Sequence, residues 1–183
     1  FENKEFIDKK KFFPADFIAE GVDQTRGWFY TLHAISSMVF GSVSYKNVIS
    51  NGLVLDKEGQ KMSKRLGNAV DPFKTLSDFG PDATRWYMIS NSNPWDNLKF
   101  DLNGVEEVKR KFFGTLYNTY SFFALYANID KFKFTEKEID FIKRPELDRW
   151  IISELNSLIL KVDNYYNDYE PTKAARAISS FVI

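Results

Sequence analysis

The sequence lacks cysteine and contains a single histidine, His33. The absence of cysteine excludes disulfide bonds and thiolate metal sites, and it is compatible with a cytosolic protein. Because the one histidine falls inside a predicted helix, a His/Cys metal site or a histidine-centred catalytic triad has little support. We therefore expect no metal bound by the protein itself.

A long hydrophobic run and a net charge are also missing. No apolar stretch approaches the roughly 18–20 residues that span a bilayer, and no signal-peptide pattern is present, so no membrane partner is expected. Twenty-five basic residues balance twenty-five acidic ones. Any contact with phosphate or nucleic acid must therefore come from local clusters of charge.

The composition is that of a globular protein. The chain has 183 residues, of which 44% are hydrophobic and 17% aromatic, enough to bury the core of one large or two small domains. It begins at Phe1 and not at Met, and apolar residues still recur in its last stretch, AARAISSFVI. No helix-ending Gly, Asn or Pro occurs there, so we expect a piece of a longer polypeptide.

The first hundred residues alternate between strand and helix patterns. Residues 16–20 are predicted as a buried strand ending at Gly21, and residues 23–40 as a helix that Asp23 can cap. Residues 47–55 are predicted as strand; their Asn-Gly pair suits a type I′ hairpin turn, so one strand and two strands are both open. Two helix starts with proline in the first turn follow, at Asp71-Pro72 and Pro81-Asp82.

Beyond residue 101 only helix patterns remain. Apolar residues recur in steps of three and four from 105 to 126, which predicts a long amphipathic helix whose aromatics from 112 to 126 belong to a core. Further helices are predicted from about Pro145 and about Pro171. This order predicts an α/β unit followed by an all-α helical bundle.

A polar segment follows the first predicted strand. Glu20, Asp23, Gln24 and Arg26 lie there, at the carboxyl end of a strand, where open α/β sheets bind ligands. Gly21 would let a ligand approach the backbone, and a carboxylate such as Glu20 could hold a substrate ammonium. A polar turn with a capping aspartate explains the same residues, and on spacing alone it is the commoner arrangement.

A second candidate is the basic cluster that contains Lys61, Lys64 and Arg65. Two lysines three residues apart can converge on one anion, and Gly59 and Gly67 on the flanks would allow a hinge. A solvated basic loop is the competing interpretation, and charge counting favours it. The usual phosphate-loop patterns, G-x-x-x-x-G-K-[ST] and G-x-G-x-x-G, do not occur.

Three ordered segments resemble one family. KMSKR, residues 61–65, resembles the KMSKS signature of class I aminoacyl-tRNA synthetases and is followed by LGNAVDP, as in that family. EGVDQTRGWF resembles the segment found in isoleucyl-tRNA synthetases, where the leucyl and valyl relatives carry different residues. GPDATRWYMIS is similar to the helix that follows the signature loop. The resemblance covers essentially the whole chain.

This resemblance implies a reaction. The whole enzyme would be a cytoplasmic ligase that activates isoleucine with ATP and Mg²⁺ to isoleucyl-adenylate and transfers the acyl group to tRNA(Ile). Lys64 would contact the ATP phosphates, with Lys61 and Ser63 assisting catalysis. The nucleotide would also lie near Asn51, Gly52 and Leu53. The aminoacyl-adenylate would be bound by Glu20, Gly21, Asp23, Gln24 and Trp28, the last as a wall of the isoleucine side-chain pocket.

The resemblance also implies a domain arrangement. Residues 1–101 would be the C-terminal half of a Rossmann-like catalytic domain, and residues 102–183 the start of a helical anticodon-binding domain. The HIGH motif, the first half of the nucleotide fold and the editing domain would precede Phe1, so the fragment alone is expected to be inactive without the remainder of the synthetase chain. Arg65 in place of Ser, and Asn51 where many bacterial members carry His, resemble the eukaryote-like branch.

Two other function classes are compatible with the sequence. The helices after residue 102 carry scattered Lys and Arg, so a free-standing RNA-binding module without catalysis is the first alternative. A structural fragment whose aromatics form a partner surface is the second. Salt-dependent tRNA binding by residues 102–183 would favour the former, and tight oligomerisation the latter.

Overall fold

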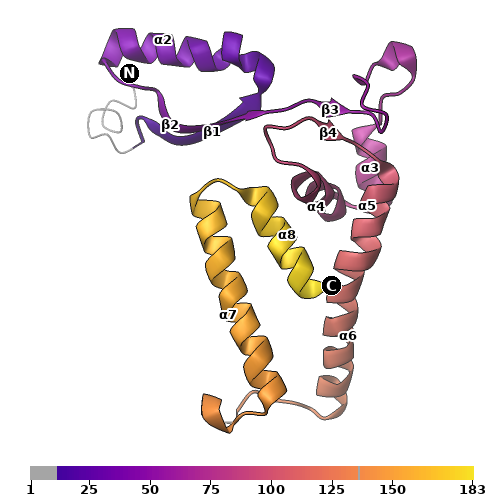
Figure 1. Ribbon diagram of the computed structural model, residues 1–183. Helices are drawn as coiled ribbons and strands as arrows, with labels where there is room; N and C mark the ends of the chain where they lie inside the picture. The colour runs from indigo at the N-terminus through magenta and orange to yellow at the C-terminus, as the bar shows by residue number, and fades with distance from the viewer. Residues whose placement is uncertain (1–11, 136) are drawn as a thin grey trace. The chain divides into compact units, whose positions relative to one another are not determined.

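The computed structural model describes residues 12–135 and 137–183, which form two compact units. The first comprises the described residues up to Asn68 together with Pro94–Lys99, and the second comprises Ala69–Asn93 with Phe100–Ile183. The first unit holds the strands and the second only helices (Figure 1). An α/β part and a helical part are thus confirmed, while the predicted domain boundary between 101 and 102 stays a prediction.

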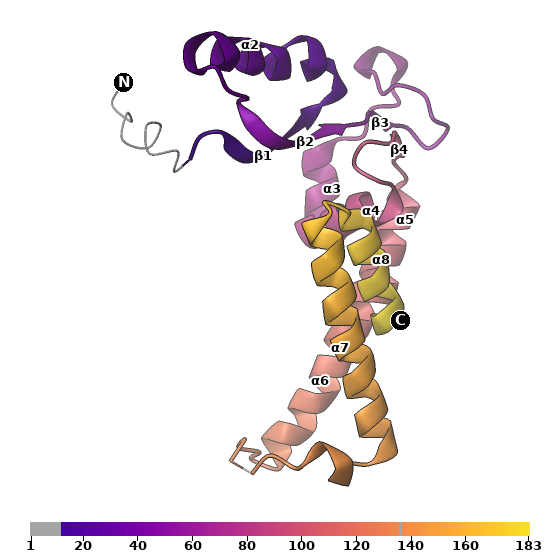
Figure 2. The same ribbon diagram turned by 60° about the vertical axis from the view of Figure 1, so that its left-hand side comes forward.

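The first unit is built on a βαβ arrangement. Strand β1 (Ala15–Gly21) pairs in parallel with β2 (Tyr45–Asn51), and helix α2 (Trp28–Phe40) connects them and covers one face of the pair (Figures 1 and 2). Buried Phe29 on α2 packs with its ring centroid 6.3 Å from that of Tyr45. The predicted first strand and the end of the predicted helix are confirmed, but the strand is not buried as predicted, because each residue of β1 is at least partly exposed.

The start of that helix was predicted wrongly. A 3₁₀ helix, η1 (Val22–Arg26), comes first, and α2 begins only after Gly27, whose φ of −133° and ψ of −108° interrupt the helical path. The first amide of α2, on Trp28, donates to Oε1 of Gln24 at 2.9 Å. Gln24 therefore supplies the side-chain acceptor at this helix start, which had been assigned to Asp23.

Residues 47–55 form two strands, and no hairpin joins them. Strand β3 (Val54–Leu55) pairs in parallel with β4 (Leu98–Lys99), so β2 and β3 belong to different two-stranded sheets. The turn between them is held from outside: the Gly52 amide donates to the Pro94 carbonyl at 2.8 Å, and the Leu53 amide to Oδ1 of Asn97 at 2.8 Å. The partner of the Asn-Gly turn thus comes from a segment more than 40 residues later in the chain.

Among the described residues of the second unit, the regular elements are all helices. Asp71 caps the first helix, because its Oδ1 accepts the amides of Phe73 and Lys74, and Pro72 occupies the first turn, as predicted. The long helix predicted after residue 101 is present, with a π-helical segment in its path. The helices are α3 (Pro72–Phe79), α4 (Pro81–Asn91), α5 (Leu102–Val108), the π-helix η3 (Lys109–Phe113), α6 (Gly114–Ile129), the 3₁₀ helix η4 (Phe141–Lys143), α7 (Glu146–Asn167) and α8 (Pro171–Val182).

The core of this unit lies where α4 meets α5, η3 and α8. Trp86 of α4 stacks on Phe112 with ring centroids 4.3 Å apart, and its Nε1 donates to Oγ of Ser179 at 3.1 Å. Arg176 on α8 donates to the carbonyls of Ser90 and Asn91 at 2.8 and 2.7 Å, so it covers the last carbonyls of α4. These contacts attach the last helix to the start of the unit.

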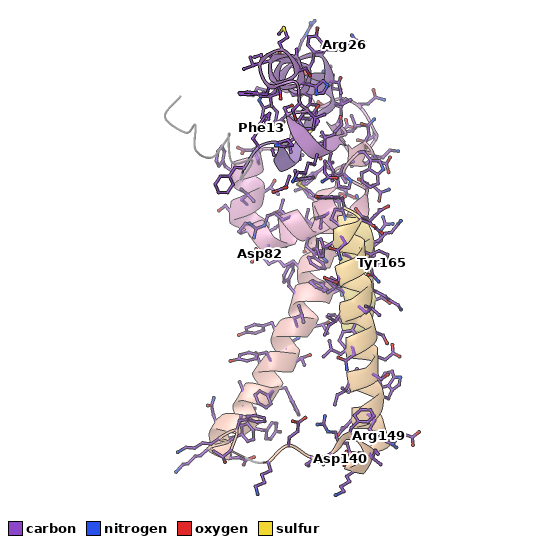
Figure 3. All side chains as sticks on the ribbon, turned by 90° about the vertical axis from the view of Figure 1, so that its left-hand side faces the viewer. Phe13, Arg26, Asp82, Asp140, Arg149 and Tyr165 are labelled. Carbon is purple, nitrogen blue, oxygen red and sulfur yellow. The ribbon has the colours of Figure 1, made fainter. Side chains whose placement is uncertain are left out.

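The aromatic face of α6 is not core, contrary to the sequence prediction. Phe112 in η3 is buried, but Tyr120, Phe123 and Tyr126 are more than half exposed. The closest neighbour of α7 is α8, and Figure 3, where Arg149 and Tyr165 mark the two ends of α7, shows side chains projecting freely along α6. Helical periodicity identified the apolar face correctly, but it could not say whether anything in this chain covers it.

No helix among the described residues combines the length and the apolar character needed to cross a membrane.

Thr172 is expected to fix α8 through one buried hydrogen bond. It is fully buried, and its Oγ1 donates to the Ser92 carbonyl at 3.0 Å. Thr172→Val keeps the shape but leaves that carbonyl without its donor, which should lower the free energy of local opening of α8 by about 1–3 kcal/mol. Faster amide hydrogen exchange in α8 would report the change. Thr119→Val is the matched control, because its hydroxyl is exposed and bonds only within α6, and unchanged exchange in α8 is expected there.

Candidate functional site

The two groups of predicted binding residues meet at one edge of the first sheet. Because β1 and β2 are parallel, their carboxyl ends lie together, and Gly21 is in register with Asn51, as Glu20 is with Ser50. Adjacent strands lie about 4.8 Å apart. The residues expected to hold the aminoacyl-adenylate and those expected near the nucleotide are therefore neighbours, although about 30 residues separate them in the sequence.

Hydrogen bonds order the turn that follows β1. Oε1 of Glu20 accepts the amide of Gly21 at 2.9 Å, and Oδ2 of Asp23 accepts Nε2 of Gln24 at 3.2 Å. A Cβ placed on Gly21 would lie 2.7 Å from Oδ1 of Asp23, so the turn has no room for a side chain there unless Asp23 moves. Glu20 and Asp23 are both exposed, and this arrangement presents two carboxylates that could receive an ammonium group.

Trp28 lies at the first residue of α2, beside this edge. Its ring centroid is 5.8 Å from that of buried Phe29, while the Trp28 side chain itself is 44% exposed. An indole that packs on a buried ring and is partly open to solvent can form one wall of an apolar pocket. The assignment of Trp28 to the isoleucine pocket stays a prediction.

The backbone after β2 is fixed by the segment Pro94–Lys99. A Cβ on Gly52 would overlap the carbonyl of Asp96 and lie 2.9 Å from the amide nitrogen of Asn97. Only glycine fits this close approach, which explains why the sequence places one between Asn51 and Leu53. Sequence reasoning missed this whole supporting segment, because it has no strand pattern of its own beyond two residues.

The basic cluster lies in a loop that leaves β3 and folds back on it. Lys61 forms an isolated antiparallel bridge with Leu55, and the 3₁₀ helix η2 (Lys64–Leu66) ends at Gly67 with φ of +68°. Oγ of Ser63 accepts the Arg65 amide at 3.2 Å and so caps this turn. Ser63 therefore has a structural contact in addition to its predicted catalytic one.

Both lysines of the motif are presented to solvent. Lys61 and Lys64 are exposed, and within residues 12–135 and 137–183 neither ammonium has a hydrogen-bond or ion-pair partner. Two uncompensated cations three residues apart on a folded turn are suited to an oxyanion such as a phosphate. In the same described ranges, no hydrogen bond joins this loop to the edge formed by Gly21 and Asn51.

Two residues that sequence reasoning missed hold the loop at its ends. Asp56 is 9% exposed, and its carboxylate accepts Nδ2 of Asn68 and the amide of Gln60, both at 2.7 Å. These bonds, that from Asn68 most of all, lower the pKa of the Asp56 carboxyl from its ordinary value, so it is ionised at neutral pH. The signal available in the sequence was an Asp at the end of an apolar run, followed by a Gly-containing turn.

No group of three or more acidic or histidine side chains suited to a metal ion occurs among the residues that the structure describes.

Two family matches cover different parts of the chain. Residues 1–101 match the family described as tRNA synthetases class I (I, L, M and V), and residues 148–183 match the anticodon-binding domain of tRNA ligase.

Similar sequences come from several bacteria. The chain is 71% identical over 182 residues to an isoleucine–tRNA ligase of Bacteroides fragilis, 70% to one of Porphyromonas gingivalis and 52% to one of Clostridium tetani. In each case the match covers 100% of this chain but only 16–17% of the relative. The chain therefore spans about one sixth of the length of these relatives.

Solved structures show the same fold at low sequence identity. A leucyl-tRNA synthetase of Agrobacterium radiobacter K84, in a ternary complex with tRNA and LeuAMS, matches 92% of this chain and 22% of its own with a TM-score of 0.70 and 20% identity. A methionyl-tRNA synthetase of Mycobacterium tuberculosis, in complex with methionyl-adenylate, matches 94% of this chain and 33% of its own with a TM-score of 0.74 and 20% identity. The fold, the KMSKR loop and the family match agree, and the chain belongs to the class I tRNA synthetases.

Proposed function

We propose that this chain is part of an isoleucine–tRNA ligase. The whole protein would activate isoleucine with ATP to isoleucyl-adenylate and then transfer the acyl group to tRNA(Ile) in the cytoplasm. The register of Gly21 with Asn51 carries the proposal, because it brings the two groups of predicted binding residues to one strand edge. The 71% identity to an isoleucine–tRNA ligase supports isoleucine as the amino acid.

Glu20 and its neighbours are proposed to bind the amino-acid half of the adenylate. An exposed carboxylate at the end of β1 suits the α-ammonium of isoleucine, and Asp23 adds a second negative charge in the same turn. Gln24 is held between Asp23 and the start of α2, so its contribution is to order the turn as well as to line the site. Trp28 would then contact the aliphatic side chain.

The lysines are proposed to act on the leaving group. In adenylate formation a carboxylate oxygen of isoleucine bonds to the α-phosphorus of ATP, and the bond between that phosphorus and the bridging oxygen to the β-phosphate breaks. Negative charge accumulates on the departing pyrophosphate, which Lys64 and Lys61 would stabilise. Mg²⁺ would enter as part of the ATP substrate and further neutralise the phosphates.

The helical part is proposed to begin the tRNA-binding portion, from residue 102 onward. The match of residues 148–183 to an anticodon-binding domain supports this, and the structurally similar leucyl-tRNA synthetase was solved with tRNA bound. The remainder of the synthetase chain would complete both the catalytic site and the tRNA surface.

The test uses the full-length protein that contains this chain. We expect it to exchange radiolabelled pyrophosphate into ATP in the presence of isoleucine, with much lower kcat/KM for valine and none detectable for leucine or methionine. Charging of tRNA(Ile) but not of tRNA(Met) is expected in a second assay. Exchange that depends on leucine or methionine and ignores isoleucine would overturn the proposal.

A further inference from the structure

The loop from Asp56 to Asn68 is closed at its base by side-chain hydrogen bonds. At its first residue, the Asp56 amide donates to the Gln60 carbonyl at 2.9 Å, and the Asp56 carbonyl accepts the Gly59 amide at 2.9 Å. The carboxylate adds the bonds from Gln60 and from Asn68 described above. One buried residue thus joins the turn at the start of the loop to the last residue of the loop.

Asn68 extends the same network into the signature motif. Its Oδ1 accepts the Ser63 amide at 2.9 Å, and its Nδ2 donates to the Lys61 carbonyl at 3.3 Å as well as to Asp56. The carboxylate and the carbonyl require the amide nitrogen on one side, and the Ser63 amide requires the oxygen on the other, so the network fixes the orientation of the side chain. Asn68 therefore holds the backbone on both sides of Met62.

In this arrangement the backbone of the motif is held by hydrogen bonds, while its lysine ammonium groups are free to move in solvent. The main chain of the motif is tied to half-buried Asn68 and through it to buried Asp56, whereas Lys61 and Lys64 extend into solvent from that main chain. Long lysine side chains lose rotamer freedom when they bind a phosphate. Because the backbone of the motif is already ordered, only the lysine side chains lose conformational entropy when a phosphate binds.

We propose that Asp56 and Asn68 form a clasp, a pair of positioning residues that places Lys61 and Lys64 for the transition state of adenylate formation. The inference rests on the proposed function and deepens it, because it assigns to two residues outside the KMSKR motif the control of where the motif's cations lie. Neither Asp56 nor Asn68 is placed in contact with substrate.

The chemistry of the pair offers a reciprocal test in the full-length protein. D56N leaves one acceptor oxygen for two donors, so either Nδ2 of Asn68 or the Gln60 amide loses its bond, and N68D sets a second carboxylate against Asp56, so each single change breaks the network. D56N combined with N68D restores the bond with donor and acceptor exchanged and keeps an acceptor for the amides of Gln60 and Ser63. Its one cost is at the Lys61 carbonyl, which faces a carboxylate oxygen in place of the Nδ2 donor 3.3 Å away.

The readouts are exchange kinetics and limited trypsin cleavage. Each single variant is expected to lower kcat for isoleucine-dependent exchange by about 10- to 100-fold with KM for isoleucine unchanged, and the double variant to recover to within about fivefold of wild type. Trypsin should cut after Lys61, Lys64 or Arg65 faster in both single variants, and at the wild-type rate in the double variant.

Matched controls exist in the same unit. Nδ2 of Asn47 donates to the Asp16 carbonyl at 2.9 Å, and the Asp16 carboxylate pairs with Lys46 on the surface. N47D and D16N make the same chemical changes away from the loop, so wild-type kcat and wild-type cleavage at the loop are expected.

The outcomes are separable. If wild type shows no isoleucine-dependent exchange, the proposed function fails together with the catalytic part of this inference, and the cleavage pattern alone decides whether the clasp exists. If wild type is active and D56N and N68D leave kcat unchanged, or the double variant is no better than the worse single one, the inference is overturned while the proposed function stands.

Discussion

Lys64→Ala in the full-length protein is expected to slow isoleucine-dependent ATP–pyrophosphate exchange by about 100- to 1,000-fold, the cost of removing one preorganised charge at a developing oxyanion. The structure gives the reason. Lys64 begins a capped 3₁₀ turn, and its ammonium has no partner among the described residues, so its charge is available for phosphate and its loss disturbs no ion pair. Because the charge on pyrophosphate grows only as the bond breaks, kcat should fall while KM for isoleucine stays within about twofold.

Lys57→Ala is the matched control for this experiment. Lys57 lies seven residues earlier in the same loop, where its ammonium is 3.6 Å from Glu58 on an exposed turn. An exposed pair of this kind contributes little, so its removal should leave exchange within about twofold of wild type. Equal losses in kcat and in isoleucine affinity for Lys64→Ala would contradict a transition-state role, and a wild-type rate would remove Lys64 from the site.

Local sequence signals predicted the parts of the fold that depend on local chemistry. The strand ending at Gly21, the end of α2 at Gly41 and the capped start of α3 at Asp71 all follow from residues within a few positions of each element. Gly41 adopts φ of +60°, a conformation that glycine enters at low cost, and Asp71 accepts two amides of the next turn. These features are decided by neighbours in sequence.

Features that depend on distant partners were not predictable in this way. The Asn-Gly pair at 51–52 has the composition of a hairpin turn, yet Pro94 and Asn97 take its amides, and β3 pairs with a strand 44 positions later. The face of α6 at Tyr120 and Phe123 has core spacing but is exposed. In both cases the pattern was recognised correctly, and the missing information was which segment would pack against it.

The candidate site also contains residues that the sequence could identify and residues that only the structure shows. Glu20 could be placed at the carboxyl end of a strand, where open α/β sheets bind ligands. Asn51 was expected near the nucleotide only through the family resemblance, and the structure is what puts it in register with Gly21. Asp56 and Asn68 could not be found by counting charges, since their contribution is to bond main-chain groups and each other. Residues that present charge are visible in a sequence, whereas residues that hold a backbone in place become visible only with the geometry.

Gly52→Val is the second change with a large expected effect. The position has no room: even a Cβ would overlap the Asp96 carbonyl, so the segment Pro94–Lys99 must move away from the turn after β2. The move breaks the bonds from the Gly52 amide to Pro94 and from the Leu53 amide to Asn97. Overpacking alone costs about 1–3 kcal/mol, and the lost hydrogen bonds add to it.

The functional consequence of Gly52→Val follows from what the turn connects. Displacing Asn51 and Leu53 by about 1 Å should reduce kcat/KM for exchange by about 100-fold, with the larger share in KM for ATP, because these residues are proposed to lie near the nucleotide. Faster hydrogen exchange at the Leu53 and Leu98 amides would show that β3 and β4 have separated. Gly114→Ala is the control, since a Cβ there would lie 3.6 Å from the Lys109 carbonyl, an ordinary contact within a helix. If Gly52→Val keeps its amides protected and its kinetics at the wild-type level, the segment Pro94–Lys99 can move without loss of stability. The close approach at Gly52 would then not position the residues near the nucleotide.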